Sequence, residues 1–556
     1  MSNISDDQLK IIKNCVNKIA KKYRVIGVCL YGSKVAGYAQ SKSDFDIIIV
    51  LEGYPHIIKY VYIKESGIEV SALVVDHKSL EKDAKAAFLG EFVVGRLLHI
   101  YEPITNPILF KQLEKTYKKR IILEEVFNIV KSTKVLSTEI SFPLEFVMFS
   151  KIKHRSTLYP NAIYSYYKIY TGENAIRNTK FALDGYQQAL REILTEYKEL
   201  LVEKPSDNIL QISDKSIQNG DRLSPLKMPK KLREFGSYLI HSYAGRHTFH
   251  YAIKEAKLKV RRHIGYRIEL PKFISCPRQV YWKLPEGILI FDSRDWLDII
   301  AKSAGFSRYI LSKKKRLGDI SSRTISYTLT NSDNENQKKV IVVKEIPKLK
   351  GVKWAALSVW TMPVKRFRVD PLFRLGTEYK ALRYIRSLGL KTPRIESVVL
   401  DRKLLITEFI EGKTLEDIIK EFLKGSTFDG LSWIKMAGEQ IAKIHADKST
   451  LGNVKPKNLI IHKNILYFTD IEQFGFKSGD PVWDLIQFIS WGLKGTNNTV
   501  LASQIIREFL KGYSKKMTIE YIKKLVKSKR YIESFYPILT LSVAQTIKKE
   551  INNFAS

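Results

Sequence analysis

The stretch LYGSKVAGYAQSKSDFDIIIV, residues 30–50, decides how the N-terminal part of the chain folds. The run Val25–Tyr31 is short, apolar and rich in β-formers, and it ends abruptly at Gly32 and Ser33. This pattern predicts a strand, a glycine turn and the start of a helix. Because glycine has no Cβ, Gly32 would let backbone amides approach a phosphate, and the Ser33 hydroxyl could donate to the same group.

Two acidic residues follow the predicted turn. Asp44 and Asp46 run directly into the apolar segment Ile47–Leu51, which is predicted to be a strand. Since side chains alternate along a strand, the two carboxylates would project on one side, and a cation between them would relieve their repulsion. Magnesium or manganese ions there could bind nucleotide phosphates and lower the pKa of an attacking group. The run GIEVSALVV supplies Glu69 as the third acid and candidate base, although Ser71 lies on the same face.

These features together resemble the signature of the minimal nucleotidyltransferases in the DNA polymerase β superfamily. The resemblance covers about the first 105 residues. It implies that Gly32 and Ser33 bind the phosphates of a nucleoside triphosphate and that Asp44, Asp46 and one more acid ligate the metal ions. The alternative is a surface turn followed by a strand with Asp44 as a cap, which leaves the second acid on the same face unexplained.

The middle of the chain, between Asn106 and Phe306, has no catalytic signature but shows helical periodicity, as in KQLEKTYKKRIILEEVFNIVK. We therefore predict an α-rich basic connector. Residues 226–286 hold fourteen Lys and Arg against four Asp and Glu. Such a stretch could bind RNA or another nucleic acid through phosphates and stacked bases, or it could be a solvated helix face with its rings turned to a core. The aromatic residues concerned are Tyr243, Phe249, Tyr251, Tyr266 and Tyr281.

A third group of patterns begins near Ser307. Lys344 closes the apolar strand KKVIVVKEI, and Glu378 begins the helical run EYKALRYIRSL. A strand lysine that pairs with a glutamate of the next helix is one way to position nucleotide phosphates. Further along, a helix ending in IAKIHA precedes the loop LGNVKPKN, the strand pair LIIHKNILYF and Asp470 in TDIEQFGF.

In this order the C-terminal segments resemble the protein-kinase-like fold, closest to the lipopolysaccharide-kinase and RIO-kinase branch. The resemblance spans about residues 310–520. It implies that Lys344 contacts nucleotide phosphates, that Glu378 pairs with Lys344, and that Asn458 and Asp470 hold magnesium.

The chain departs from this family pattern at two places. Where the pattern His-Gly-Asp would supply the catalytic aspartate, the chain has Leu451, Gly452 and Asn453, and an amide cannot accept the proton of a substrate hydroxyl as a carboxylate can. The segment before Lys344 reads SYTLTNSDNENQ, without a glycine-rich loop. These departures favour a domain that binds ATP but is weak or inactive as a kinase.

The charge of the whole chain favours polyanionic partners. Its 556 residues, too many for one core, carry 93 Lys and Arg against 57 Asp and Glu, a formal net charge of +36. The wide spacing of Cys15, Cys29 and Cys276 argues against a disulfide framework or a zinc site. No run reaches the roughly 18 uncharged apolar residues that a membrane span needs, so we predict a cytoplasmic protein without a transmembrane segment.

The sequence thus predicts an α+β multidomain chain. A nucleotidyltransferase domain with a mixed sheet and helices would cover residues 1–105, the connector 106–306, and a two-lobed protein-kinase-like domain 307–556. The predicted reaction is the magnesium-dependent transfer of a nucleoside monophosphate from ATP or another nucleoside triphosphate to a hydroxyl of an RNA end or a protein side chain. Two alternatives stay open: a serine/threonine-type or small-molecule kinase regulated by the N-terminal domain, and a nucleic-acid-binding scaffold that senses ATP.

Overall fold

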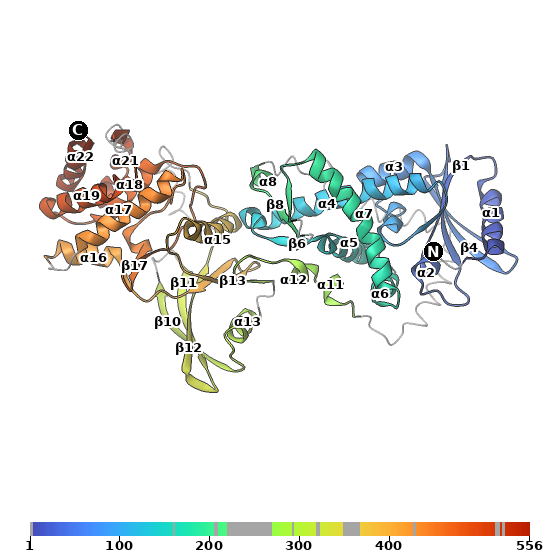
Figure 1. The fold of residues 1–556 in the computed structure, drawn as a ribbon, viewed down its shortest axis with the longest axis horizontal. Helices are drawn as coiled ribbons and strands as arrows, with labels where there is room; N and C mark the ends of the chain where they lie inside the picture. The colour runs from blue at the N-terminus through green and yellow to red at the C-terminus, as the bar shows by residue number, and fades with distance from the viewer. Residues whose placement is uncertain are drawn as a thin grey trace. The chain divides into compact units, whose positions relative to one another are not determined.

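The chain folds into two compact units, each containing helices and sheets (Figure 1). Unit 1 comprises Met1–Lys131 and Ile140–Lys283, and unit 2 comprises Ser132–Glu139 and Leu284–Ser556. The predicted fold class, α+β and multidomain, is confirmed. The computed structural model describes residues 4–159, 162–204, 209–218, 269–291, 294–317, 323–347, 367–425, 430–517, 523–524 and 529–555.

Unit 1 is built on a five-stranded mixed sheet with the strand order β3-β4-β2-β1-β5. Its strands are β1 (Val25–Tyr31), β2 (Phe45–Leu51), β3 (Ile58–Glu65), β4 (Ile68–Asp76) and β5 (Glu102–Thr105). Strands β2 and β4 are parallel, whereas β1 is antiparallel to β2 and to β5. The apolar runs predicted to be strands at residues 25–31 and 47–51 are therefore the neighbouring strands β1 and β2, and β2 is the central strand of this sheet.

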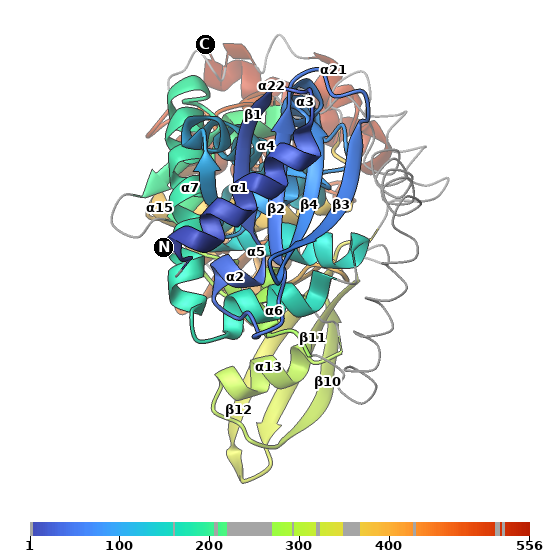
Figure 2. The same cartoon turned by 90° about the vertical axis from the view of Figure 1, so that its right-hand side faces the viewer.

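Helix α1 (Asp6–Ala20) covers one face of this sheet (Figure 2). Ser5 caps it by accepting a hydrogen bond from the Gln8 amide at 3.2 Å, and the Gln8 side chain accepts one from the Ser5 amide in return. The apolar side chains of α1 pack on those of the strands that point the same way, among them Val28, Leu30, Phe45, Ile47 and Ile49. Because side chains alternate, Tyr31 and Asp46 project on the opposite face.

The other elements of unit 1 are mostly helices. They are α2 (Ser33–Ala36), α3 (His77–Ala86), η1 (Val94–Leu98), α4 (Pro107–Thr133, which runs into unit 2), α5 (Leu144–Leu158), α6 (Ile163–Thr171), α7 (Ala175–Glu196), α8 (Asp214–Gln218), α11 (Lys272–Ser275) and α12 (Pro277–Tyr281), with a small sheet of β6 (Ser141–Pro143), β8 (Ile209–Ile212) and β7 (Leu201–Lys204). Buried Glu91 binds Arg120 of α4 at 2.9 Å and Lys151 of α5 at 2.7 Å. This network joins helices α4 and α5 of the predicted connector to the segment between α3 and η1.

Most of the basic stretch at residues 226–286 lies outside the described residues, with Tyr243, Phe249, Tyr251 and Tyr266 among those left out. Tyr281 ends α12 and stacks on Phe149 of α5, with ring centroids 6.0 Å apart. This one ring is therefore packed against a core helix.

Unit 2 contains a six-stranded sheet with the order β10-β11-β12-β14-β13-β9 and a three-stranded sheet, β15-β16-β17. The strands are β9 (Ile288–Ile290), β10 (Tyr309–Leu317), β11 (Arg323–Asn331), β12 (Asn334–Glu345), β13 (Ile395–Val399), β14 (Leu404–Glu408), β15 (Lys413–Thr414), β16 (Leu459–His462) and β17 (Ile465–Phe468). The helices are η2 (Lys134–Thr138), α13 (Trp296–Ser303), α15 (Pro371–Ser387), α16 (Leu415–Leu423), α17 (Gly430–Ala446), η5 (Pro456–Asn458), α18 (Pro481–Gly492), α19 (Thr499–Tyr513), α21 (Lys529–Glu533), η6 (Tyr536–Ile538) and α22 (Leu541–Ala555).

Helix α15 begins earlier than the sequence pattern indicated. It starts at Pro371, capped by the Asp370 carboxylate, which accepts a hydrogen bond from the Phe373 amide at 2.7 Å. The prediction that Glu378 begins this helix was therefore wrong. An aspartate cap followed by proline is a signal for the start of a helix, and here it lies about two turns before Glu378. Glu378 lies in the middle of α15.

Within the described ranges, no helix combines the length and the apolar character that a membrane crossing requires.

Candidate functional site

One edge of the unit 1 sheet gathers the polar residues of the first predicted site. Strand β1 ends there at Tyr31, and β2 and β4 both begin there. Gly32 follows β1 with φ = 81°, a conformation that favours glycine. The Asp46 carboxylate lies against it, so that a Cβ at Gly32 would come within 2.1 Å of Asp46 Oδ2. Space and backbone conformation thus both require glycine beside this carboxylate.

The three predicted acids of this edge have different environments. Asp44 and Asp46 are half-buried, one just before β2 and the other its second residue. Buried Ser71 of β4 stands directly opposite Asp46 in the parallel ladder. Glu69, two residues before Ser71, points to the same face, but it is exposed and forms an ion pair with Lys64 of β3 at 2.9 Å. The structure therefore brings all three acids to one edge, with Glu69 already bound to a cation.

The turn after Gly32 is braced by residues that the sequence patterns did not single out. Asn178 of α7 is fully buried and donates to the carbonyls of Ala36 at 3.0 Å and Ile169 at 3.1 Å. The neighbouring Arg177 donates to the Val35 carbonyl at 2.8 Å. These bonds satisfy carbonyls at the end of α2 and hold the segment that follows Ser33.

We expect Asn178→Ala to lower the free energy of unfolding by about 2 kcal/mol, since it leaves two buried carbonyls without their donor. It should also raise the KM for the nucleoside triphosphate more than it lowers kcat, because α2 would no longer be held. Thermal unfolding and steady-state kinetics measure the two effects. The matched control is Asn174→Ala, which removes an exposed bond to the Gly37 carbonyl at 3.3 Å. Equal behaviour of the two variants would contradict the bracing role.

The second predicted site forms around Lys344 in unit 2. Its ammonium donates to Glu378 Oε2 of α15 at 2.7 Å and also forms a hydrogen-bonded ion pair with Asp470. The lysine and the glutamate predicted to pair are thus paired. No glycine-rich loop precedes the lysine: β11 and β12 are joined by a tight turn at Ser332 and Asp333.

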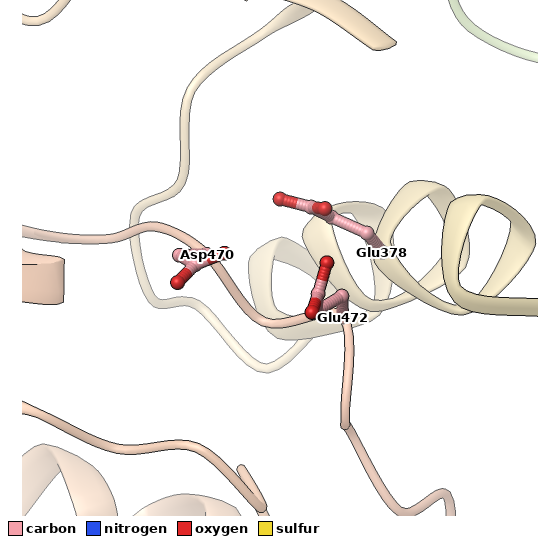
Figure 3. A group of neighbouring side chains, drawn as sticks. All are labelled: Glu378, Asp470 and Glu472. Atoms are coloured by element: carbon pink, nitrogen blue, oxygen red, sulfur yellow. The ribbon is translucent and has the colours of Figure 1, made fainter. Parts of the chain in front are cut away.

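Glu472 is a third carboxylate in this cluster, and the sequence analysis missed it. Its Oε2 lies 3.5 Å from Lys344 Nζ, and its Oε1 accepts from Arg374 at 2.6 Å. Oxygen atoms of Glu378, Asp470 and Glu472 all lie within 4.8 Å of one another (Figure 3). The signal was available in the sequence, because Glu472 stands two residues after Asp470 in TDIEQF.

The electrostatics of this cluster reflect more negative than positive charge. Burial raises the pKa of Glu378 to about 7, and the Asp470 and Glu472 carboxylates add to the rise while Lys344 opposes it. Burial alone would raise the pKa of Asp470, but Lys344 lowers it below its usual range. Lys344 and Arg374 face three carboxylates, so a divalent cation with oxygen ligands would be compatible with the donors present.

The loop after α17 brings the remaining predicted residues to Asp470. The amide groups of Asn458 and Asn453 point their nitrogen atoms at Asp470 Oδ2, at 3.3 and 3.5 Å. Buried Asp484 fixes the loop by accepting hydrogen bonds from the Leu451 amide at 2.6 Å and the Gly452 amide at 2.8 Å. Asp470 itself has φ = 54°, a conformation that costs energy for a residue with a Cβ and that is common at functional sites.

Comparison with known proteins agrees with both halves of this description. Residues 9–127 match the nucleotidyltransferase domain family. A protein of Methanococcus vannielii named as a probable bifunctional tRNA threonylcarbamoyladenosine biosynthesis protein is 25% identical over 177 residues, which are 30% of this chain and 30% of the relative. A protein of the same name from Methanobrevibacter smithii is 29% identical over 166 residues, 28% of this chain and 29% of the relative.

A smaller relative is the KEOPS complex subunit Bud32 of Pyrococcus abyssi, 24% identical over 112 residues, which are 19% of this chain and 50% of the relative. The chain thus spans less than a third of the length of the bifunctional relatives and half of Bud32. Together with the family match and the assembled Lys344–Glu378 pair, these relatives support the two resemblances seen in the sequence. The chain therefore carries a nucleotidyltransferase domain at its N-terminus, fused to a protein-kinase-like domain.

Proposed function

We propose that the chain transfers a nucleoside monophosphate from a nucleoside triphosphate to a hydroxyl acceptor. The observation that carries this proposal is the Asp46 carboxylate packed against Gly32, at the edge where Asp44 and Glu69 also lie. The acceptor oxygen would attack the α-phosphorus, the bond from that phosphorus to the β-bridging oxygen would break, and pyrophosphate would leave. The proton of the acceptor hydroxyl would pass to a carboxylate.

Each residue of this edge has a proposed role. Asp44 and Asp46, with Glu69 as the third acid, would hold magnesium or manganese ions, which supply Lewis-acid stabilisation of the phosphates. Glu69 would also serve as the base, which requires its carboxylate to leave Lys64. The backbone at Gly32 and the Ser33 hydroxyl would bind the phosphates. An RNA acceptor is favoured over a protein side chain by the charge of +36 and by relatives whose names concern tRNA.

The test is incubation of the pure protein with each α-labelled nucleoside triphosphate and magnesium, with and without total RNA. We expect label to appear in RNA together with released pyrophosphate. Label in the protein itself would identify a protein acceptor. No transfer of α-label under any of these conditions would refute the proposal.

We propose in addition that the protein-kinase-like domain binds ATP and is weak or inactive in phosphoryl transfer. Lys344 and Glu378 would bind the phosphates, and Asn458 and Asp470 would hold magnesium. Glu472 supports this reading because it adds a carboxylate next to Asp470. Asn453 has the position of the catalytic base without a carboxylate, so proton removal from a substrate would lack its usual acceptor.

Lys344→Ala should remove most of the thermal stabilisation that ATP and magnesium give to this domain. The variant loses the cation at the phosphates and leaves Glu378 and Asp470 without their lysine partner, so binding should weaken by about a hundredfold. Thermal shift at several ATP concentrations measures the change. Lys339→Ala is the matched control, since it removes a lysine from the same strand whose partner is Glu396 at 2.6 Å. Similar ATP stabilisation in both variants would refute the assignment of the nucleotide site.

Two rival functions are tested by the same materials. If the chain is a kinase regulated by its N-terminal domain, γ-label will move to a substrate and Asp470→Ala will abolish that transfer. If it is a nucleic-acid-binding scaffold that senses ATP, RNA binding will be salt-dependent and will survive substitution of Asp44, Asp46 and Asp470, with no label moved.

A further inference from the structure

At the sheet edge where Asp46 lies, the face opposite α1 carries polar and aromatic side chains. Tyr31 of β1, Asp46 of β2 and Ser71 of β4 stand directly opposite one another on neighbouring strands. Their side chains therefore share one face, while the other face packs on α1. A nucleoside triphosphate held near Asp46 would bring several negative charges to the Tyr31 side of the sheet.

Two cations beside the glycine turn are committed elsewhere. The Lys34 ammonium lies over the Phe45 ring, 5.0 Å from its centroid, and Phe45 belongs to the opposite, α1-covered face. The Arg177 guanidinium donates to the Val35 carbonyl and to the amide oxygen of Asn178. Both side chains are engaged in these contacts, so a further cation near Asp46 would help to balance a triphosphate.

Arg96 of η1 is a cation on the Asp46 face. Its guanidinium carbon lies 5.3 Å from the centroid of the Tyr31 ring and 5.6 Å from that of Phe92. Tyr31 and Tyr38 are each close enough to both Arg96 and Asp46 for both charges to act on their pKa values, in opposite directions, although burial is the main reason that these values are raised. Arg96 and Asp46 thus both lie near the same two tyrosines.

The hydrogen-bonding capacity of Arg96 is poorly used. Its Nη2 donates to the Tyr60 hydroxyl at 3.4 Å, and its Nε is buried without a hydrogen-bond partner. Among the residues that the structure describes, no carboxylate lies within ion-pair distance of it. A guanidinium whose Nε is buried without a partner is costly, and its planar set of donors matches phosphate oxygen atoms.

We propose that Arg96 binds the triphosphate of the nucleotide substrate and stays with the pyrophosphate as it leaves. This inference rests on the proposed nucleotidyl transfer and names the residue that would neutralise the leaving group. Charge develops on the β- and γ-phosphates when the bond to the α-phosphorus breaks, and a fixed guanidinium there would stabilise it. The contacts of Arg96 with the rings of Tyr31 and Phe92 would hold it in position for this role.

The experiment compares Arg96→Ala and Arg96→Lys in the full-length chain. Inorganic tripolyphosphate is the binding probe, and all variants also carry Lys344→Ala so that the kinase-like domain contributes little. We expect Arg96→Ala to weaken tripolyphosphate binding and to raise the KM for the nucleotide by about tenfold or more. The binding and KM of Arg96→Lys should lie between those of Arg96→Ala and those of the chain that keeps Arg96. Arg24→Ala is the matched control, because exposed Arg24 pairs with Glu52 at 3.5 Å in the same unit.

Each outcome decides for or against the assignment. Unchanged binding and KM in both Arg96 variants would show that Arg96 only packs between its two rings. A changed KM for the acceptor alone would place Arg96 at the acceptor and overturn the proposal. If Arg96→Ala does not fold, as thermal unfolding would reveal, the Arg96→Lys result decides. If the parent chain moves no label, nucleotidyl transfer itself fails, whereas tripolyphosphate binding still tests whether Arg96 holds phosphates.

Discussion

Asp46→Asn should reduce nucleotidyl transfer by about a thousandfold. A carboxylate that ligates a catalytic metal ion contributes several kcal/mol to transition-state stabilisation, and each 1.4 kcal/mol is a factor of ten in rate. Asparagine has nearly the same size, so it would keep the packing against Gly32, where Asp46 Oδ2 occupies the space of a Cβ. The loss should therefore be chemical and should leave the fold intact. Transfer of α-label at saturating nucleotide and magnesium measures it.

The matched control for Asp46→Asn is Glu52→Gln. Glu52 follows the opposite end of β2, is exposed and pairs with Arg24 at 3.5 Å. The substitution therefore removes one carboxylate from the same unit at a distance from the site. We expect unchanged transfer for Glu52→Gln and equal melting temperatures for both variants. More than a tenth of the parent activity in Asp46→Asn would contradict metal ligation by this residue.

The N-terminal elements were predictable because their signals are local. The β-rich run at Val25–Tyr31 and the glycine after it each depend on a few neighbouring residues, and the structure contains the corresponding strand and turn. The alternation rule also placed Asp44 and Asp46 on one side of the same strand. Whether Glu69 supplies the third ligand stays a prediction, because its carboxylate is bound to Lys64.

Residues that act through long-range contacts were not predictable in the same way. Arg96 is isolated in the sequence, and only the folded chain brings it to Tyr31. Asn178 lies in helix α7, and nothing in the surrounding sequence marks it as a donor to the turn after Ser33. A periodic pattern predicts which residues form a helix, but the partners of each polar side chain depend on tertiary packing.

The segment Ser132–Glu139 is a clear case of this kind. The sequence prediction placed this segment in the connector, because it directly follows the predicted helix KQLEKTYKKRIILEEVFNIVK. In the structure its contacts place it in unit 2. There η2 packs against α15, the helix that carries Glu378. Thr138 accepts a hydrogen bond from Lys380 at 3.2 Å, and Glu139 forms an ion pair with Arg383. The residues that precede the kinase-like pattern by more than 150 positions thus restrain its central helix.

Gly376→Ala tests this restraint, and we expect it to lower the free energy of unfolding of unit 2 by about 3 kcal/mol. Alanine in place of glycine inside a helix ordinarily stabilises it by about 1 kcal/mol, so the sign is reversed here. The reason is that a Cβ at Gly376 would lie 2.3 Å from the Leu136 backbone nitrogen and 3.0 Å from Val135. Backbone atoms cannot move aside as a side chain can, so η2 or α15 must shift.

The shift should also weaken nucleotide binding in unit 2, because Glu378 stands two residues after Gly376 and pairs with Lys344. Chemical denaturation followed by tryptophan fluorescence reports on this unit, since Trp282 is the one tryptophan outside it. The matched control is Gly492→Ala, where the new Cβ would meet the Ile419 Cδ1 methyl at 3.3 Å and could displace it. If Gly376→Ala has the same stability and the same ATP-induced thermal shift as Gly492→Ala, then η2 does not restrain α15.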